Sequence, residues 1–167
     1  MAIIHLVEGP VGAGKSTYAS QLGQEYRAPV LNLDDWMVTL FSPDRPMENA
    51  IEWYIERKER CIEQIWKVTS EIISSGNDVI LELGLIQQAS RQKFFDKVEF
   101  ARYMMRIYVL DAPREIRRMR VQRRNREQGT TYSMAVPDHV FEMASNLWEP
   151  VEQLECNGYE VKYISTV

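Results

Sequence analysis

The sequence predicts an α/β fold, with a mostly parallel five-stranded sheet and helices on both of its faces. Short apolar segments alternate along the chain with longer segments of helical periodicity, as in strands joined by crossover helices. A glycine-rich loop, Gly9–Thr17, follows the first apolar segment and precedes the first helical one. The length of 167 residues predicts a single domain, residues 1–167, with one core.

The apolar runs and the residues that interrupt them define the expected elements. Strands are expected at residues 2–8, 30–33, 78–83, 103–110 and 158–164. Helices are expected at residues 16–23, 47–75, 88–98, 113–127 and 137–148. Gly76 suits the end of a helix, and Pro113 and Pro137 suit a first turn. One stripe of isoleucines within 47–75 is expected to face the core, with the charged residues 57–60 and 63 largely on other faces. Its members are Ile51, Ile55, Ile62, Ile65, Ile72 and Ile73.

The glycine-rich loop fits the phosphate-binding motif G-x-x-x-x-G-K-[ST], the P-loop. Glycines let the backbone wrap around a phosphate with its amides pointing inward, and the following helix adds its positive N-terminal end. Lys15 is expected to contact the β- and γ-phosphates of ATP, and Ser16 to ligate Mg²⁺. The motif therefore predicts a P-loop NTPase fold that binds ATP and Mg²⁺. The expected nucleotide-binding residues are Gly9, Gly12, Ala13, Gly14, Lys15, Ser16 and Thr17.

Acidic residues occur where two of the expected strands end, at the sheet edge that carries the loop. Asp34 and Asp35 follow the strand at 30–33. A phosphotransferase needs a carboxylate that orients the acceptor hydroxyl and accepts its proton, whereas the alternative role of such a pair is to cap the next helix. Glu82 lies near the end of the strand at 78–83 and is a candidate Mg²⁺ ligand, directly or through water. The alternative for Glu82 is simply the polar end of a buried strand.

Arginine dominates the expected helix at 113–127. The seven arginines are Arg114, Arg117, Arg118, Arg120, Arg123, Arg124 and Arg126. Such a surface suits solvation or ion pairing, and it equally suits an Arg-rich lid that places guanidinium groups on nucleotide phosphates. The four arginines nearest the polar stretch 128–133 are the lid candidates, and one or two of them are expected to be functional.

Composition and charge exclude several other classes of function. The formal net charge of −4 and the sequence pI of about 5.3 argue against a general nucleic-acid surface. Cys61 and Cys156 have no metal-binding or redox spacing, which favours a reducing compartment. No apolar run approaches the roughly 20 residues that span a bilayer, and no signal peptide precedes the first strand. We expect a cytoplasmic protein with no membrane partner. Nothing in the sequence predicts its oligomeric state.

The order of these motifs resembles the small P-loop kinases of the polynucleotide 5′-hydroxyl kinase, zeta-toxin and chloramphenicol phosphotransferase group. Four stretches, which span nearly the whole chain, carry the resemblance: Gly9–Thr17, Leu31–Trp36, Arg123–Gly129 and Ala135–Asp138. The resemblance implies an ATP-dependent kinase that phosphorylates an alcohol group. It also implies that Asp34 is the catalytic base, that Arg120 and Arg124 bind phosphate, and that Arg91 contacts the acceptor or a phosphate.

The chain departs from the pattern of these kinases at three places. Met37-Val38-Thr39 stands where polynucleotide kinases carry an arginine shortly after the acidic pair, and Gln128 stands where a lid arginine is expected. The third strand commonly ends in Asp in this group, whereas this chain has Glu82 followed by Leu83-Gly84. The first departure and the net charge favour a small-molecule acceptor and make a nucleic-acid partner less favoured. The alternatives are a non-catalytic nucleotide-binding switch or slow NTPase, a 5′-hydroxyl nucleic-acid kinase, and a toxin that acts on a nucleotide sugar.

Overall fold

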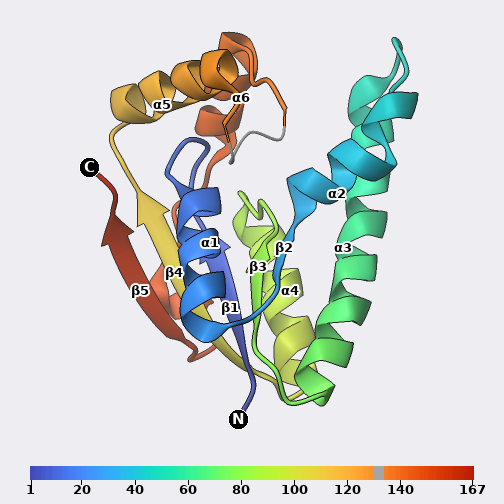
Figure 1. The fold of residues 1–167 in the computed structure, drawn as a ribbon, viewed down its shortest axis with the longest axis vertical. Helices are drawn as coiled ribbons and strands as arrows, with labels where there is room; N and C mark the ends of the chain where they lie inside the picture. The colour runs from blue at the N-terminus through green and yellow to red at the C-terminus, as the bar shows by residue number, and fades with distance from the viewer. Residues whose placement is uncertain (130–133) are drawn as a thin grey trace.

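The computed structural model of the protein describes residues 1–129 and 134–167 and has the expected α/β architecture (Figure 1). Its five strands form one sheet in the order β2-β3-β1-β4-β5, and every neighbouring pair is parallel. The strands are β1 (Ile3–Glu8), β2 (Val30–Asn32), β3 (Val79–Glu82), β4 (Met104–Asp111) and β5 (Glu160–Ser165). The helices are α1 (Lys15–Tyr26), α2 (Leu33–Leu40), α3 (Ala50–Ser74), α4 (Gln88–Phe100), α5 (Arg114–Glu127) and α6 (Asp138–Leu147).

Helices pack on both faces of the sheet, as the sequence predicts. On one face, Ala19 and Leu22 of α1 pack against Val7, Ile80 and Leu110 of the strands. On the other face, α2, α3 and α4 cover a larger cluster. Its buried helical members are Leu33, Met37, Cys61, Ile65, Phe94, Phe95 and Val98. Because both faces are covered, β1 and β3 read as nearly continuous apolar runs.

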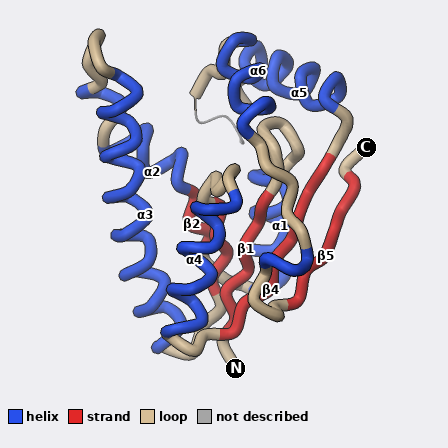
Figure 2. The backbone as a smooth tube through the Cα atoms, turned by 180° about the vertical axis from the view of Figure 1, so that it is seen from behind, coloured by secondary structure: helices blue, strands red, loops and turns tan. Residues whose placement is uncertain are grey.

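The carboxyl ends of the strands meet at one edge, and α5 and α6 lie beyond this edge (Figures 1 and 2). Polar residues end the strands there: Glu8 in β1, Asn32 in β2, Glu82 in β3 and Asp111 in β4. Asn32 and Glu82 are paired in register, so their side chains start from neighbouring positions. Ligands of parallel α/β sheets bind outside this edge.

The sequence does not predict helix α2, it places the start of α3 at residue 47 rather than at Ala50, and two further boundaries are wrong. The first helix does not stop near Gly23 but continues to Tyr26, and Arg27 ends it with a left-handed φ of 50°. The second strand ends at Asn32, and Leu33 already belongs to α2. The apolar run 30–33 therefore spans a strand and the start of a helix, because Asn32 caps that helix with its side chain. Asp34 and Asp35 lie in the first turn of α2 rather than at a strand end.

The expected isoleucine stripe of α3 is wrong in its first part. Ile51 and Ile55 are 71% and 52% exposed, whereas Ile65 is buried. The first turns of α3 extend past the carboxyl edge of the sheet, where no strand lies beneath them (Figure 1). Among the described residues, no helix combines the length and the apolar character that a membrane span requires.

Candidate active site

The phosphate-binding loop joins β1 to α1 and contains the expected glycine conformations. Gly12 has φ of 79°, and a Cβ at this position would lie 2.7 Å from the carbonyl oxygen of Arg117. Gly14 has φ of 98° and caps α1. A side chain at Gly12 would both strain the backbone and collide with α5. The first amides of α1 have no partner within the helix, so those of Lys15, Ser16 and Thr17 are available to an anion.

Side chains from α5 and the end of β5 hold the loop from behind. Arg117 is buried and donates from Nη1 to the carbonyl oxygen of Val11 (2.9 Å) and from Nε to that of Ala112 (3.0 Å). Thr166 donates from Oγ1 to the carbonyl oxygen of Ala13 (2.7 Å). The amide of Ala13 donates to the carbonyl oxygen of Pro10 at 3.1 Å. These bonds fix the loop, so an arriving phosphate meets a preorganised backbone.

Lys15 lies in the loop with its ammonium group turned back on the backbone. Its Nζ donates to the carbonyl oxygens of Gly9 (2.8 Å) and Pro10 (3.0 Å). Burial lowers the pKa of Lys15, while the negative charges of Glu82, Glu8 and Asp34 act in the opposite direction. The expected phosphate-binding lysine is therefore tied by hydrogen bonds that a phosphate would replace.

Ser16 and Glu82 come together as the sequence predicts for a cation site. Ser16 donates from Oγ to both carboxylate oxygens of Glu82 at 3.1 Å, and Asn32 donates from Nδ2 to Glu82 Oε2 at 2.8 Å. Burial raises the pKa of Glu82, and Lys15 opposes that rise. A hydroxyl beside a buried carboxylate fits Mg²⁺, which takes a few protein oxygens and completes its shell with water and phosphate. Within residues 1–129 and 134–167, no cluster of three or more His, Cys, Asp or Glu could hold a metal ion by itself.

Asp34 and Asp35 project from the first turn of α2. Asn32, not either aspartate, caps this helix: its Oδ1 accepts from the amides of Asp34 (2.9 Å) and Asp35 (3.3 Å). Capping is therefore accounted for, and both aspartates are exposed. The charge of Asp34 acts on Lys15, Glu82 and also on Lys58 and Tyr54 of α3, whereas that of Asp35 acts on Glu82. Asp34 thus lies within electrostatic reach of the loop, of Glu82 and of α3.

The arginines of α5 have different surroundings. Arg124 lies near Lys15 and lowers its pKa, and the buried Nε of Arg124 has no hydrogen-bond partner among the described residues. Arg120 instead bonds to Thr166 and, more weakly, to the carbonyl oxygens of Gly12 and Ala13. Arg123 is exposed, with Glu127 at 3.9 Å. Part of the expected lid, residues 130–133, lies outside the described residues.

Arg91 does not reach the site, contrary to the expectation from the resemblance. It is 0% exposed and pairs with the buried Glu155 at 3.1 Å. It also donates to the carbonyl oxygens of Leu85 (3.0 Å) and Glu149 (2.8 Å). With its donors taken by Glu155 and by these backbone oxygens, Arg91 is a structural residue that joins α4 to residues 149–155.

Two residues near the loop were not predicted from the sequence to belong to the site. Glu8, the last residue of β1, is 1% exposed, and burial raises its pKa to about 8 against the charges of Arg91, Lys15 and Lys58. Lys58 of α3 donates from Nζ to the carbonyl oxygen of Gly84, just past β3, at 3.3 Å. The available signals were an acid directly before the loop and a lysine three residues before Cys61 and seven before Ile65, on the face that packs inward.

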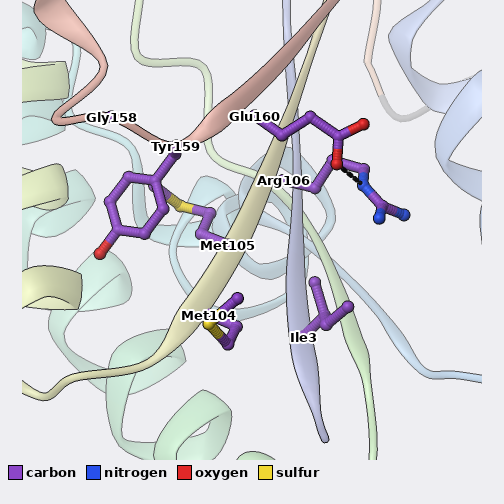
Figure 3. A pocket seen from close by; sticks show the side chains of 7 residues that line it. All are labelled: Ile3, Met104, Met105, Arg106, Gly158, Tyr159 and Glu160. Atoms are coloured by element: carbon purple, nitrogen blue, oxygen red, sulfur yellow. Dashed lines mark hydrogen bonds and ion pairs between the residues drawn. The ribbon is translucent and has the colours of Figure 1, made fainter.

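A separate hollow of about 150 Å³ lies at the opposite end of the strands (Figure 3). Ile3, Met104 and Glu160, which begin β1, β4 and β5, line it, and Arg106 pairs there with Glu160 at 2.6 Å. None of the site residues expected from the sequence lines this hollow, so it plays no part in the candidate site.

A match to a protein-family model shows the family to which the chain belongs. The model of the family described as AAA domain matches residues 4–150, which contain the loop, α2, β3 and α5. The chain belongs to the AAA domain family. The match to this AAA domain includes every residue expected at the site from the sequence. A search of curated protein sequences finds no match.

Solved structures share the fold of this AAA domain at low sequence identity. A candidate kinase from Chloroflexus aurantiacus J-10-fl has a TM-score of 0.75 and 17% identity over 99% of this chain and 85% of its own. Kti12 of Chaetomium thermophilum, solved with ADP-AlF3, has a TM-score of 0.69 and 14% identity over 98% and 89%. A chain of the Pnkp1/Rnl/Hen1 RNA repair complex has a TM-score of 0.61 and 21% identity over 87% and 43%. The fold is therefore that of P-loop kinases and related nucleotide-binding proteins.

Proposed function

We propose that the protein is an ATP-dependent phosphotransferase that moves the γ-phosphoryl group of MgATP to a hydroxyl group of a small-molecule acceptor. The observation that carries the proposal is the convergence of Lys15, the Ser16–Glu82 pair and Asp34 at one sheet edge. A nucleotide-binding loop alone indicates phosphate binding. A free carboxylate facing that loop adds the group that a transfer to an alcohol requires.

The proposed roles follow from the positions of the side chains. The amides at the start of α1 and the Lys15 ammonium would bind the β- and γ-phosphates, once Lys15 exchanges the Gly9 and Pro10 carbonyl oxygens for phosphate oxygens. Ser16 and Glu82 would hold Mg²⁺, which neutralises charge on the phosphates when bound. Asp34 would orient the acceptor hydroxyl and accept its proton as the oxygen attacks phosphorus and ADP leaves.

Among the arginines, Arg124 is the favoured phosphate ligand and Arg120 a secondary one. Arg124 lies within electrostatic reach of Lys15 and carries a buried donor with no partner among the described residues, which a phosphate oxygen would satisfy. Arg120 would first have to leave Thr166. Water must be excluded during transfer, since hydrolysis of ATP is the competing reaction.

The direct test is a screen of hydroxyl compounds with MgATP, with the products detected by mass spectrometry. We expect one class of acceptor to gain 80 Da, the mass of HPO₃. We expect the Lys15→Ala variant to form no such product. The alternative of a switch or slow NTPase predicts that ATP binds while no acceptor gains mass. That outcome would overturn the proposed transfer and leave nucleotide binding intact.

A 5′-hydroxyl nucleic-acid kinase is the second candidate, because one protein of similar fold belongs to an RNA repair complex. The net charge of −4 and the exposed acids Asp34 and Asp35 at the proposed acceptor position disfavour a polyanionic acceptor. The screen should therefore include a 5′-hydroxyl oligonucleotide, and preferential labelling of its 5′ end would favour this candidate.

A further inference from the structure

The inward face of α3 changes character along its length. Cys61, Ile65 and Thr69 are buried against the sheet at spacings of four residues. The same face continues toward the start of the helix through Lys58 and Tyr54, which lie three and seven residues before Cys61. The start of α3 passes the carboxyl edge of the sheet (Figure 1), and Lys58 reaches the segment just after β3 there, through its bond to the Gly84 carbonyl oxygen. Tyr54 is 36% exposed, whereas Lys58 is half-buried, so Lys58 is the charged residue that this face brings to the sheet edge.

Lys58 is a half-buried cation for which the described residues provide little compensation. Among the described residues, Lys58 makes one hydrogen bond, to the carbonyl oxygen of Gly84 at 3.3 Å. An ammonium group carries three donors. No ion pair within 4.0 Å includes Lys58 among the described residues. The negative charges of Asp34 and Glu8 oppose the lowering of its pKa by burial. Partial burial of a cation is costly unless an anion accompanies it.

Asp34 lies within electrostatic reach of this part of α3. Its charge acts on both Lys58 and Tyr54, and burial raises the pKa of Tyr54 to about 12, so its hydroxyl stays protonated as a donor. A compound bound to Asp34 through a hydroxyl group therefore has an ammonium group and a phenol beside it. The carboxylate of Asp34 repels a second anion, whereas Lys58 attracts one.

We propose that Lys58 is a specificity-determining residue that binds an anionic group, a carboxylate or a phosphate, on the acceptor whose hydroxyl group lies at Asp34. This inference rests on the proposed function and names its substrate class, an anionic alcohol. A neutral alcohol of the same skeleton would leave the Lys58 ammonium group without a counterion in the closed site. An ammonium–anion contact of this kind contributes roughly 10-fold to 100-fold in affinity.

Two matched sets of compounds test the inference. Glycerol, glycerate and glycerol 3-phosphate share one skeleton, as do glucitol, gluconate and glucitol 6-phosphate. Binding of each to the MgADP-saturated protein is measured by calorimetry, and phosphorylation of each with MgATP by mass spectrometry. We expect a charged member of one set to bind at least about 10-fold more tightly than its neutral member. Whether the carboxylate or the phosphate binds more tightly identifies the anion.

Lys58→Met should abolish this preference, with a rise of about 30-fold in the dissociation constant and KM of the charged compound. Lys58→Arg should restore most of the preference, because it keeps the charge. Arg60→Met is the matched control, since Arg60 lies on the outer side of α3 with its side chain 59% exposed. A purely structural role for Lys58 would alter stability or ATP affinity and leave the ratio between charged and neutral compounds unchanged.

The outcomes separate this inference from the proposed function. Binding of a charged compound that Lys58→Met abolishes, without any phosphorylated product, supports the Lys58 site and counts against phosphoryl transfer. Equal use of neutral and charged compounds, or a preference that survives in Lys58→Met, overturns the Lys58 site and leaves phosphoryl transfer standing. Failure of all four charged compounds to bind also overturns it.

Discussion

The carboxyl group of Glu8 has a strongly raised pKa, and burial is the main cause. The side chain is 1% exposed, and its Oε1 has no hydrogen-bond partner among the described residues. Burial raises its pKa to about 8, so near neutral pH most of this carboxyl is protonated in the folded protein. The position directly before the loop places it within the electrostatic reach of Lys15 and Lys58.

Glu8 makes stability depend on pH. Its pKa of about 8 in the folded protein exceeds the ordinary value of 4.5, so the folded state holds the proton more tightly. The stability from this proton is complete below pH 4.5 and is lost as the pH rises through about 8. We expect Glu8→Gln to exceed the wild type by only about 1 kcal/mol near pH 5 and by about 4 kcal/mol at pH 8.

Urea unfolding of both proteins at several pH values between 5 and 8 measures this difference. Glu82 titrates in both proteins, so its contribution cancels to first order. A difference in unfolding free energy that is constant across this range would contradict the assignment of a raised pKa to Glu8.

At the scale of elements, the start of α2 determines where the proposed base lies. Asn32 bonds to the amides of Asp34 and Asp35 with one side-chain atom and to Glu82 with the other. One residue thus couples the helix that carries Asp34 to the strand that carries the candidate Mg²⁺ ligand. The sequence contained the signal, an asparagine followed by two acids. The apolar run before it favoured a longer strand instead.

Replacement of Asn32 should therefore weaken both links. We expect Asn32→Ala to lower the unfolding free energy by about 1 to 2 kcal/mol, because it removes the helix cap. It should also slow phosphoryl transfer, since Asp34 loses its fixed position, with a smaller change in ATP affinity. Ser42→Ala is the control at the other end of α2, where Ser42 donates to the carbonyl oxygen of Met37 at 3.3 Å. Urea unfolding that shows equal effects for both variants would contradict the role of Asn32.

At the scale of the whole molecule, the buried pair Arg91–Glu155 joins segments that are far apart in sequence. Arg91 belongs to α4, and Glu155 to the short 3-10 helix Gln153–Glu155 that precedes β5. Arg91→Met would leave the Glu155 carboxylate buried without its partner. We expect a loss of roughly 3 to 5 kcal/mol in unfolding free energy. The double variant Arg91→Met, Glu155→Gln should recover part of it, and urea unfolding of the three proteins measures both effects.

The sequence predicts the local features of this molecule better than its long-range contacts. The strand and the helix that flank the loop Gly9–Thr17 follow from a motif whose residues need that context. Glu82 was only a candidate Mg²⁺ ligand, and its hydrogen bond with Ser16, 66 residues away in sequence, was not predicted. The burial of Arg91 depends on Glu155, 64 residues away, and no periodicity reveals this contact. Similarly, Lys58 looked like part of a solvated run because its neighbours are charged. The packing of α3 on the sheet shows that Lys58 lies on the inward face of the helix, unlike its charged neighbours.

In the proposed reaction, Asp34 serves as the base opposite the loop Gly9–Thr17. The most direct measurement compares phosphoryl transfer by Asp34→Asn and Asp35→Asn at saturating MgATP, together with the ATP affinity of each. Both variants remove one negative charge from the same turn of α2, so each controls for the other. We expect Asp34→Asn to lose roughly 100-fold or more in transfer rate with ATP affinity retained, and Asp35→Asn to stay within a few-fold of the wild type. Transfer at the wild-type rate by Asp34→Asn would contradict the role of Asp34 as the base.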